Sequence, residues 1–197
     1  MIDKKLLIDL YINKKKSSRE VADFIRCSEH KVNYWLKNHD IKKRTISEAI
    51  YNQKNPNGDP FKFKKIKTLE DAFLSGLGIG LYWGEGTKRD TSSVRLGNSD
   101  PNLIKKFIEY LEKMWDIDRG KLRFGLQIFD DMSQSETLKF WQRYLDVYSD
   151  QFYKTMYKPS SGPGTYNKKS KYGVLTIYFS NKKLRDIICG QIENMYN

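Results

Sequence analysis

The residue in this sequence with the clearest potential for chemistry is Glu85, which stands between Gly84 and Gly86 after a stretch with helical periodicity. The C-terminal end of a helix is negative, so a carboxylate there loses roughly 0.3–1 kcal/mol. A divalent cation would relieve this penalty, because carboxylate and carbonyl oxygens suit Mg²⁺. Glu85 is therefore a candidate metal ligand. The alternative is a tightly packed helix pair in which Glu85 is simply solvated.

The helix expected before Glu85 is rich in glycine: Gly76, Gly78, Gly80 and Gly84 all lie in it. Each costs roughly 0.5–1 kcal/mol relative to alanine. Gly76, Gly80 and Gly84 are spaced i, i+4, i+8, so they form a smooth stripe that lets a second backbone approach. One such helix per chain predicts a C₂ homodimer through the stripe. Two Glu85 carboxylates would then meet and repel unless a cation lies between them.

The stretch G-I-G-L-Y-W-G-E-G, residues 78–86, resembles the LAGLIDADG motif of homing endonucleases and their relatives. The resemblance continues through V-R-L-G-N-S-D and covers about residues 68–197. It implies that Glu85 binds the catalytic metal, Mg²⁺ or Mn²⁺ with Ca²⁺ as a non-catalytic substitute, and that the Gly84 backbone carbonyl assists. Trp83 replaces the first aspartate of the motif, which places the chain in a divergent branch.

Basic residues after the motif are candidates for offsetting charge in the transition state of phosphodiester hydrolysis. They are Lys88, Arg95 and Arg123, and the motif itself does not single them out. The resemblance implies a homodimeric, Mg²⁺-dependent endonuclease that cuts double-stranded DNA at a pseudo-palindromic site. DNA-binding regulators with degenerate sites share the fold, so a non-cleaving regulator is the alternative.

Positive charge is concentrated in the first third of the chain. The 197 residues have a formal net charge of +12. Residues 1–67 contain 17 lysines and arginines against 8 acidic residues, whereas residues 68–197 contain 19 against 16. Such a basic segment favours a polyanionic partner, with nucleic acid first and an anionic membrane surface second. A soluble protein that is merely rich in lysine is the remaining explanation.

Three short helices are expected in this basic segment. Ser17 and Glu20 have the spacing of a capping box, and Ser28 can cap the third helix. Residues 18–41 resemble the helix-turn-helix of bacterial DNA-binding proteins, with Arg26 at a turn position that often holds glycine. A three-helix packing module is the alternative. Because a helix-turn-helix favours duplex DNA, RNA ranks behind DNA as the partner.

The resemblance implies that the helix over residues 28–38 enters the major groove. Its candidate DNA contacts are Ser28, His30, Lys31, Asn33, Tyr34 and Lys37. Asn33 could read an adenine edge, and either lysine a guanine or a phosphate. A basic run follows that suits a minor groove or the DNA backbone, or is a solvated linker: Lys42, Lys43 and Arg44.

The expected organisation is a helix-turn-helix domain over residues 1–53, a basic linker over 54–67 and a LAGLIDADG-like domain over 68–197. Thr45 and Glu48 repeat the capping-box spacing, which predicts another helix. In the last domain we expect strands at 94–98 and 121–129, and helices starting at Asp100 and Ser133. A hairpin of 151–157 with 172–180 and a closing helix complete it. This pattern predicts an α+β fold: an antiparallel or mixed sheet saddle packed on helices.

One face of this sheet is expected to contact DNA. Along residues 121–129, apolar side chains alternate with Lys121, Arg123 and Gln127, as they also would on an ordinary solvated face. The connection between the hairpin strands is long, glycine-rich and basic, so it is either a phosphate-contacting flap or a surface loop. The candidate contacts of this region are Gln127, Lys158, Lys168, Lys169 and Lys171.

Several classes of protein are disfavoured. No apolar run approaches the roughly 18–20 residues that span a bilayer, and the N-terminus lacks the apolar stretch of a signal peptide. Cys27 and Cys189 do not make a disulfide framework. We therefore expect a cytoplasmic protein without a membrane partner.

Overall fold

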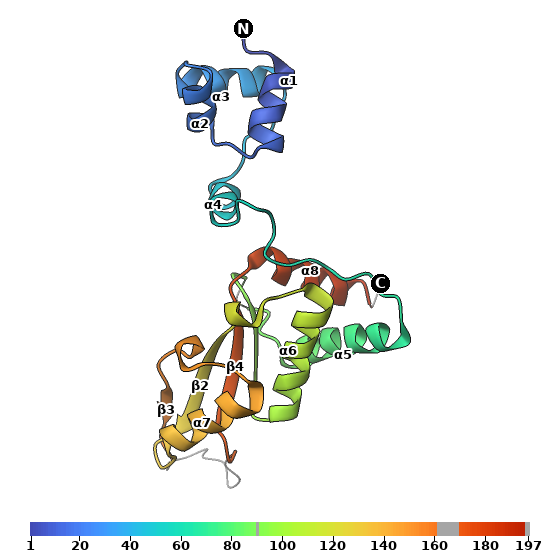
Figure 1. The fold of residues 1–197 in the computed structure, drawn as a ribbon, viewed down its shortest axis with the longest axis vertical. Coiled ribbons are helices and arrows are strands. Elements are labelled where there is room, and N and C mark those ends of the chain that lie inside the picture. The colour runs from blue at the N-terminus through green and yellow to red at the C-terminus, as the bar shows by residue number, and fades with distance from the viewer. Residues whose placement is uncertain (90, 161–169, 196–197) are drawn as a thin grey trace. The chain divides into compact units, whose positions relative to one another are not determined.

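The computed structural model describes residues 1–89, 91–160 and 170–195, and the chain divides into two units, Met1–Pro60 and Phe61–Asn197. The first unit is helical and the second combines helices with a four-stranded sheet, so the protein has the expected α+β composition (Figure 1). Within the described residues, no helix has the length and apolar character needed to cross a membrane.

Short helices build the first unit. They are α1 (Lys4–Leu7), the π-helical η1 (Ile8–Asn13), α2 (Ser18–Phe24), α3 (Glu29–Asn38) and α4 (Ile46–Lys54). The expected capping boxes at Ser17 and Thr45 both form, and the Ser28 hydroxyl accepts the Lys31 N–H at 3.2 Å to start α3. The core of the unit consists of Ile2, Leu7, Leu10, Tyr11, Val21, Ala22, Val32 and Leu36.

The turn between α2 and α3 has a backbone conformation that normally favours glycine. Arg26 has φ of 54° there, which costs an L-residue about 1 kcal/mol. The turn is nevertheless anchored, because the Cys27 N–H donates to the Ala22 carbonyl at 2.9 Å. Ala22 is only 2% exposed, and its small side chain lets α2 and α3 approach closely.

The second unit begins with the long helix α5 (Leu69–Glu85). It continues with β1 (Val94–Asn98), α6 (Pro101–Trp115), η2 (Arg119–Lys121), β2 (Arg123–Phe129), α7 (Gln134–Leu145), η3 (Ser149–Gln151), β3 (Met156–Lys158), β4 (Val174–Phe179) and α8 (Lys182–Glu193). The strand order is β1-β4-β2-β3. Strand β4 runs antiparallel to both β1 and β2, whereas β2 and β3 are parallel, so the sheet is mixed.

The hairpin expected from residues 151–157 and 172–180 does not form. Strand β4 pairs with β1 on one side and β2 on the other, so both of its edges are occupied. The short strand β3 therefore takes the outer edge of β2, where Met156 lies opposite Gln127. That expectation was wrong because alternation reveals a strand without revealing its partner.

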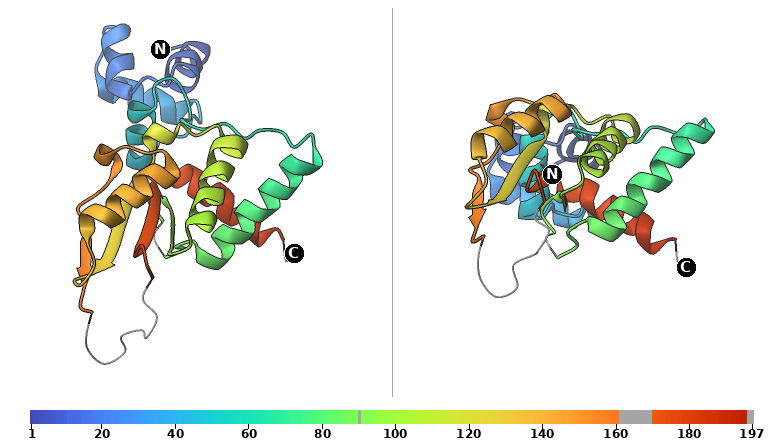
Figure 2. Two further views of the ribbon diagram at one scale, coloured as in Figure 1. Left: turned by 60° about the horizontal axis from the view of Figure 1, so that its bottom comes forward. Right: turned by 90° about the horizontal axis from the view of Figure 1, so that it is seen from below.

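The two faces of the sheet differ in character. One face is apolar and buried, and it shares a core with α6, α7 and α8 (Figure 2). Its strand residues are Val94, Leu96, Phe124, Leu126, Ile128, Leu175, Ile177 and Phe179. Helix α5 packs on α6, with the Tyr82 and Phe107 rings stacked 5.9 Å apart. None of the described helices of the second unit lies over the opposite face of the sheet.

Residues 61–64 belong to the second unit. The N–H groups of Lys62 and Lys64 donate to the carbonyls of Trp115 and Met114, each at 2.8 Å. These carbonyls are at the C-terminal end of α6, where a helix leaves its last acceptors unpaired. Phe63 adds a ring contact with Trp115 at 4.8 Å. Part of the segment expected to be a basic linker therefore caps α6.

Candidate nucleic-acid interface

The packing of α5 explains one glycine within the helix, Gly78, and one directly after it, Gly86. A Cβ on Gly78 would lie 2.1 Å from the Tyr110 ring, and a Cβ on Gly86 would lie 2.3 Å from the Tyr82 carbonyl oxygen. Tyr110 is fully buried, and burial raises its pKa to about 12. Gly78 thus allows α5 to rest directly on a neutral aromatic ring of α6.

The outer face of α5 contains the other three glycines, Gly76, Gly80 and Gly84. All are exposed, and a Cβ added to any of them would meet nothing within 4 Å. Leu69 and Phe73 extend this face toward the start of the helix and are 86% and 68% exposed. The stripe expected from the i, i+4, i+8 spacing is therefore open and apolar, and no described residue packs against it.

Glu85 is the last residue of α5, and its side chain is exposed. Of the backbone carbonyls in the last turn of α5, some accept hydrogen bonds from the following loop and others do not. The Gly86 N–H donates to Tyr82 at 2.9 Å, and the Lys88 ammonium donates to the Trp83 carbonyl. Among the described residues, no hydrogen bond to the Gly84 carbonyl is found. The helix end thus presents one carboxylate and one open carbonyl.

The loop after α5 is held in place by its neighbours. The Thr87 N–H donates to the Arg95 carbonyl at 2.9 Å, and Arg185 of α8 donates to the Lys88 carbonyl at 2.5 Å. The Tyr82 hydroxyl donates to the Thr87 carbonyl at 3.3 Å, and burial raises the pKa of Tyr82. Tyr82 therefore remains a neutral donor that orders the loop.

The open face of the sheet brings two predicted arginines onto one row. Arg95 of β1 and Arg123 of β2 are both paired with Tyr178 of β4, which lies between them. The Arg95 guanidinium lies 5.1 Å from the Tyr178 ring centre and donates to the Ser93 hydroxyl at 2.8 Å. Arg123 donates to the Gly120 and Leu122 carbonyls. Both guanidinium groups are therefore engaged by neighbouring groups of the same chain.

The remaining predicted contacts on this unit are less closely grouped. Gln127 is half-buried on β2, next to Met156. Lys158 is exposed on β3, and Lys171 is exposed with its ammonium 5.3 Å from the Tyr172 ring centre. Lys168 and Lys169 lie outside the described residues.

Helix α3 presents four of its predicted contacts together. His30, Lys31, Tyr34 and Lys37 are all exposed, and Tyr34 is 55% exposed. Two others are placed differently. The Ser28 hydroxyl caps the helix, and the Asn33 Oδ1 is buried without a hydrogen-bond partner in the described structure. In this conformation Asn33 cannot present both amide atoms to an adenine.

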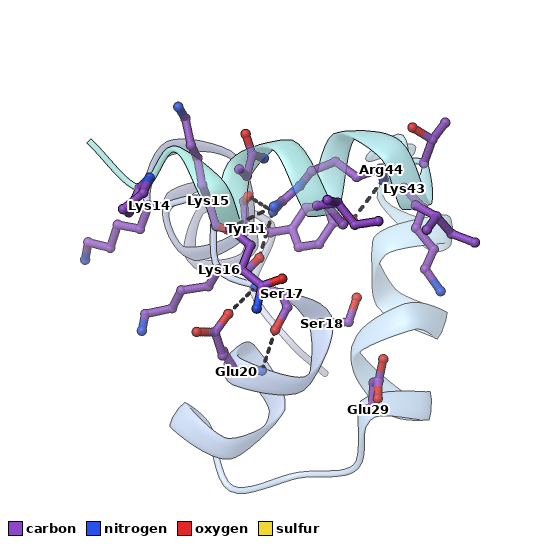
Figure 3. A pocket seen from close by; sticks show the side chains of 17 residues that line it. Tyr11, Lys14, Lys15, Lys16, Ser17, Ser18, Glu20, Glu29, Lys43 and Arg44 are labelled. Carbon is purple, nitrogen blue, oxygen red and sulfur yellow. Dashed lines mark hydrogen bonds between the residues drawn. The ribbon is translucent and has the colours of Figure 1, made fainter. Parts of the chain in front are cut away.

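The basic run after α3 is also divided. Lys42 and Lys43 are exposed, whereas Arg44 is directed into its own unit (Figure 3). Its guanidinium donates to the carbonyls of Tyr11, Lys15 and Lys16, the last two at 2.9 and 2.7 Å, and lies 4.1 Å from the Tyr11 ring centre. Arg44 therefore fixes the turn that follows η1.

Two candidate features were missed by sequence reasoning. Tyr178 lies between the two arginines of the sheet, and the alternation of V-L-T-I-Y-F over β4 would have placed it on the open face. The run Lys14, Lys15 and Lys16 was counted only as net charge, although three consecutive lysines before a capped helix were a visible signal.

The described residues contain no group of three or more His, Cys, Asp and Glu side chains placed to hold a metal ion. Compared with family models, curated proteins and solved structures, the chain gives no match.

Proposed function

We propose that this protein is a homodimeric, divalent-metal-dependent endonuclease of the homing type that recognises and cuts a pseudo-palindromic site in double-stranded DNA. The observation that carries the proposal is the open glycine stripe of α5, which ends at an exposed Glu85. An exposed apolar helix face is costly in a monomer and is typical of an interface. The resemblance of residues 78–86 to the LAGLIDADG motif assigns that interface to paired motif helices.

The first unit is proposed to recognise DNA as a helix-turn-helix. Helices α2 and α3 are joined by a tight turn at Arg26, and α3 exposes His30, Lys31, Tyr34 and Lys37 on its surface. A helix of this kind fits the major groove, where side chains reach base edges and phosphates. Two such units in a symmetric dimer would read two half-sites.

The open sheet face is proposed to be the second DNA surface. Arg95 and Arg123 are both paired with Tyr178 across the strands, and the Arg95 guanidinium lies beside the Tyr178 ring. Positive charge of this kind would neutralise phosphates, and it would also offset charge that develops during hydrolysis. Gln127 adds a hydrogen-bonding side chain on the same face.

The donor set at the end of α5 fits a shared metal site. Glu85 and the Gly84 carbonyl supply two hard oxygen ligands per chain, which are too few to enclose Mg²⁺. Packing through the stripe would bring two such sets together, and substrate phosphates would complete them. A bound divalent cation would supply activation of water and stabilisation of the leaving oxygen.

The test is DNA cleavage with Mg²⁺, using a randomised duplex library and sequencing both bound and cut products. Wild type should cut the sites that it selects, and Glu85→Gln should bind the same sites without cutting them. If wild type binds specific duplexes but cuts none of them with Mg²⁺ or Mn²⁺, the endonuclease proposal fails.

One observation favours a non-cleaving DNA-binding regulator as the second candidate. The Lys88 ammonium already donates to the Trp83 carbonyl, so the chain places its own cation at the negative end of α5. A regulator of this kind would bind its site equally well with EDTA and with Glu85→Gln.

For the endonuclease, Lys88→Met should reduce cutting more than binding, because a cation near the reacting phosphate would be lost.

A further inference from the structure

The turn after η1 contains three lysines, Lys14, Lys15 and Lys16, that are not among the DNA contacts predicted for the helix-turn-helix. Lys14, Lys15 and Lys16 line one side of a pocket of about 750 Å³ within the first unit, and Lys43 lines another (Figure 3). With Arg44 the lining includes five cations against two carboxylates, Glu20 and Glu29. The pocket surface is therefore strongly positive.

The pocket itself is a poor site for a small anion. The N-termini of α2 and α4 both open onto it, but each is occupied by a carboxylate of the same chain. Glu20 accepts the Ser17 N–H and Glu48 accepts the Thr45 N–H, each at 2.7 Å. These hydrogen bonds lower the pKa of both carboxyl groups, so they remain charged. The available positive charge is left on the lysines of the rim.

These lysines differ in how far they are engaged. Lys14 pairs with Asp9 at 2.8 Å, and the Lys16 ammonium lies 5.9 Å from the Phe24 ring centre. Lys15 and Lys43 make no ion pair with any residue that the structure describes. The lysine side chains spread outward around the rim and do not converge on a point (Figure 3). Such an arrangement suits an extended chain of charges.

The backbone of the turn is constrained to present Lys15. Lys15 has φ of 54°, a left-handed conformation that favours glycine, and Arg44 holds its carbonyl at 2.9 Å. The Lys16 N–H donates to the Leu10 carbonyl at 3.0 Å, which closes the turn. The chain therefore has an ammonium group at a position where glycine would be less strained.

We propose that this lysine turn, residues 14–16, together with Lys43 is a separate surface for the phosphate backbone of duplex DNA, and that Arg44 is a positioning residue for it. The proposal rests on DNA binding by the first unit. Lysine is a flexible point charge without the planar fork that reads a base, so this surface adds affinity and leaves sequence preference to α3. Arg44 acts by holding the turn and touches no phosphate.

The decisive variant is Lys15→Gly, because glycine relieves the left-handed backbone while it removes the ammonium. Affinity of the full chain is measured for its selected duplex and for random duplex across a salt series. Losing one phosphate contact should make the negative slope of log affinity against log salt concentration shallower by about 0.9. Affinity at 0.1 M salt should fall about tenfold. The midpoint temperature of thermal unfolding should be unchanged or slightly higher. The preference for the selected duplex over random duplex should be unchanged.

Two matched variants separate position from net charge. Lys5→Ala removes the same charge from exposed α1 and should leave the salt slope almost unchanged. Arg44→Lys keeps the charge but replaces the planar fork, whose two nitrogens reach the three carbonyls, with a single ammonium. It should therefore weaken DNA binding, whereas Lys42→Arg should not. Lys43→Gln should make the slope of log affinity against log salt shallower, as Lys15→Gly does.

Equal slopes for wild type, Lys15→Gly and Lys5→Ala would overturn this proposal and leave DNA recognition by α3 standing. Absence of duplex binding by wild type would overturn both proposals. Vesicles that contain anionic phosphatidylserine provide the third arm. If wild type binds them more tightly than duplex and Lys15→Gly abolishes that binding, the partner of the turn is a membrane surface and the DNA assignment is wrong.

Discussion

The inner and outer faces of α5 contain the same amino acid for opposite reasons. On the inner face, Gly78 is glycine because any side chain would enter the Tyr110 ring. On the outer face, a side chain on Gly76, Gly80 or Gly84 would extend into open space. None of the residues that the structure describes contacts these three positions closely enough to require glycine, and each still lowers the stability of the helix. The difference locates the unexplained requirement on the outer face, where a partner would lie.

The comparison also separates two meanings of a glycine-rich helix. Gly78 and Gly86 belong to the fold of one chain, since their neighbours are Tyr110 and Tyr82 of that chain. Gly76, Gly80 and Gly84 would instead matter for a partner that packs on the outer face of α5. A substitution scan of α5 should therefore divide into variants that unfold the protein and variants that fold but fail to assemble.

The largest effect is expected for Gly78→Ala. The added methyl would lie 2.1 Å from the ring of Tyr110, which is fully buried. Overpacking of this kind outweighs the better helix propensity of alanine, and we expect a loss of about 3 kcal/mol in the free energy of unfolding. Chemical denaturation measures it.

Gly76→Ala is the matched control for that experiment. The same methyl meets nothing on the outer face, so at concentrations where the protein is monomeric it should raise the free energy of unfolding by about 0.5–1 kcal/mol. If both substitutions destabilise the protein equally, the distinction between the two faces of α5 is wrong.

The next effect concerns assembly. Gly80→Leu places a large side chain in the middle of the outer stripe, where close approach of a second helix would be blocked. The variant should remain folded, because the position is open within the chain, but light scattering should show a monomer where wild type is a dimer. A monomeric wild type at micromolar concentration would remove the basis for a shared Glu85 site.

Sequence reasoning predicted the parts of this molecule that depend on local rules. The caps at Ser17, Ser28 and Thr45 form as expected, because a cap needs only a side chain and the N–H groups two or three residues on. The stripe on α5 follows in the same way from helical spacing. Both are encoded within a few consecutive residues.

What could not be predicted depends on residues distant in the chain. Strand β3 pairs with β2 because β4 is already occupied on both edges, and no local pattern contains that information. Arg44 was a candidate DNA contact because it belongs to the basic run after α3, yet its guanidinium donates to the carbonyls of residues 11, 15 and 16. The role of Gly78 required the position of Tyr110, which is 32 residues further along the chain.

The smallest effect tests a place where the backbone favours glycine and the sequence lacks it. Arg26 has φ of 54° in the turn before α3, so Arg26→Gly removes a conformational penalty of about 1 kcal/mol. Glycine also gives the unfolded chain more freedom, which opposes the gain. The net result should be a rise of about 0.5 kcal/mol in the free energy of unfolding.

Arg19→Gly is the control, because it makes the same chemical change at an exposed position in α2. There the backbone is helical, and glycine should lower the free energy of unfolding by about 0.5–1 kcal/mol. Opposite signs for the two variants would show that backbone conformation decides the outcome at Arg26. Equal losses in the free energy of unfolding would mean that the arginine side chain stabilises the turn. In that case, the space around a residue and its φ angle would not be enough to explain where this protein has glycine.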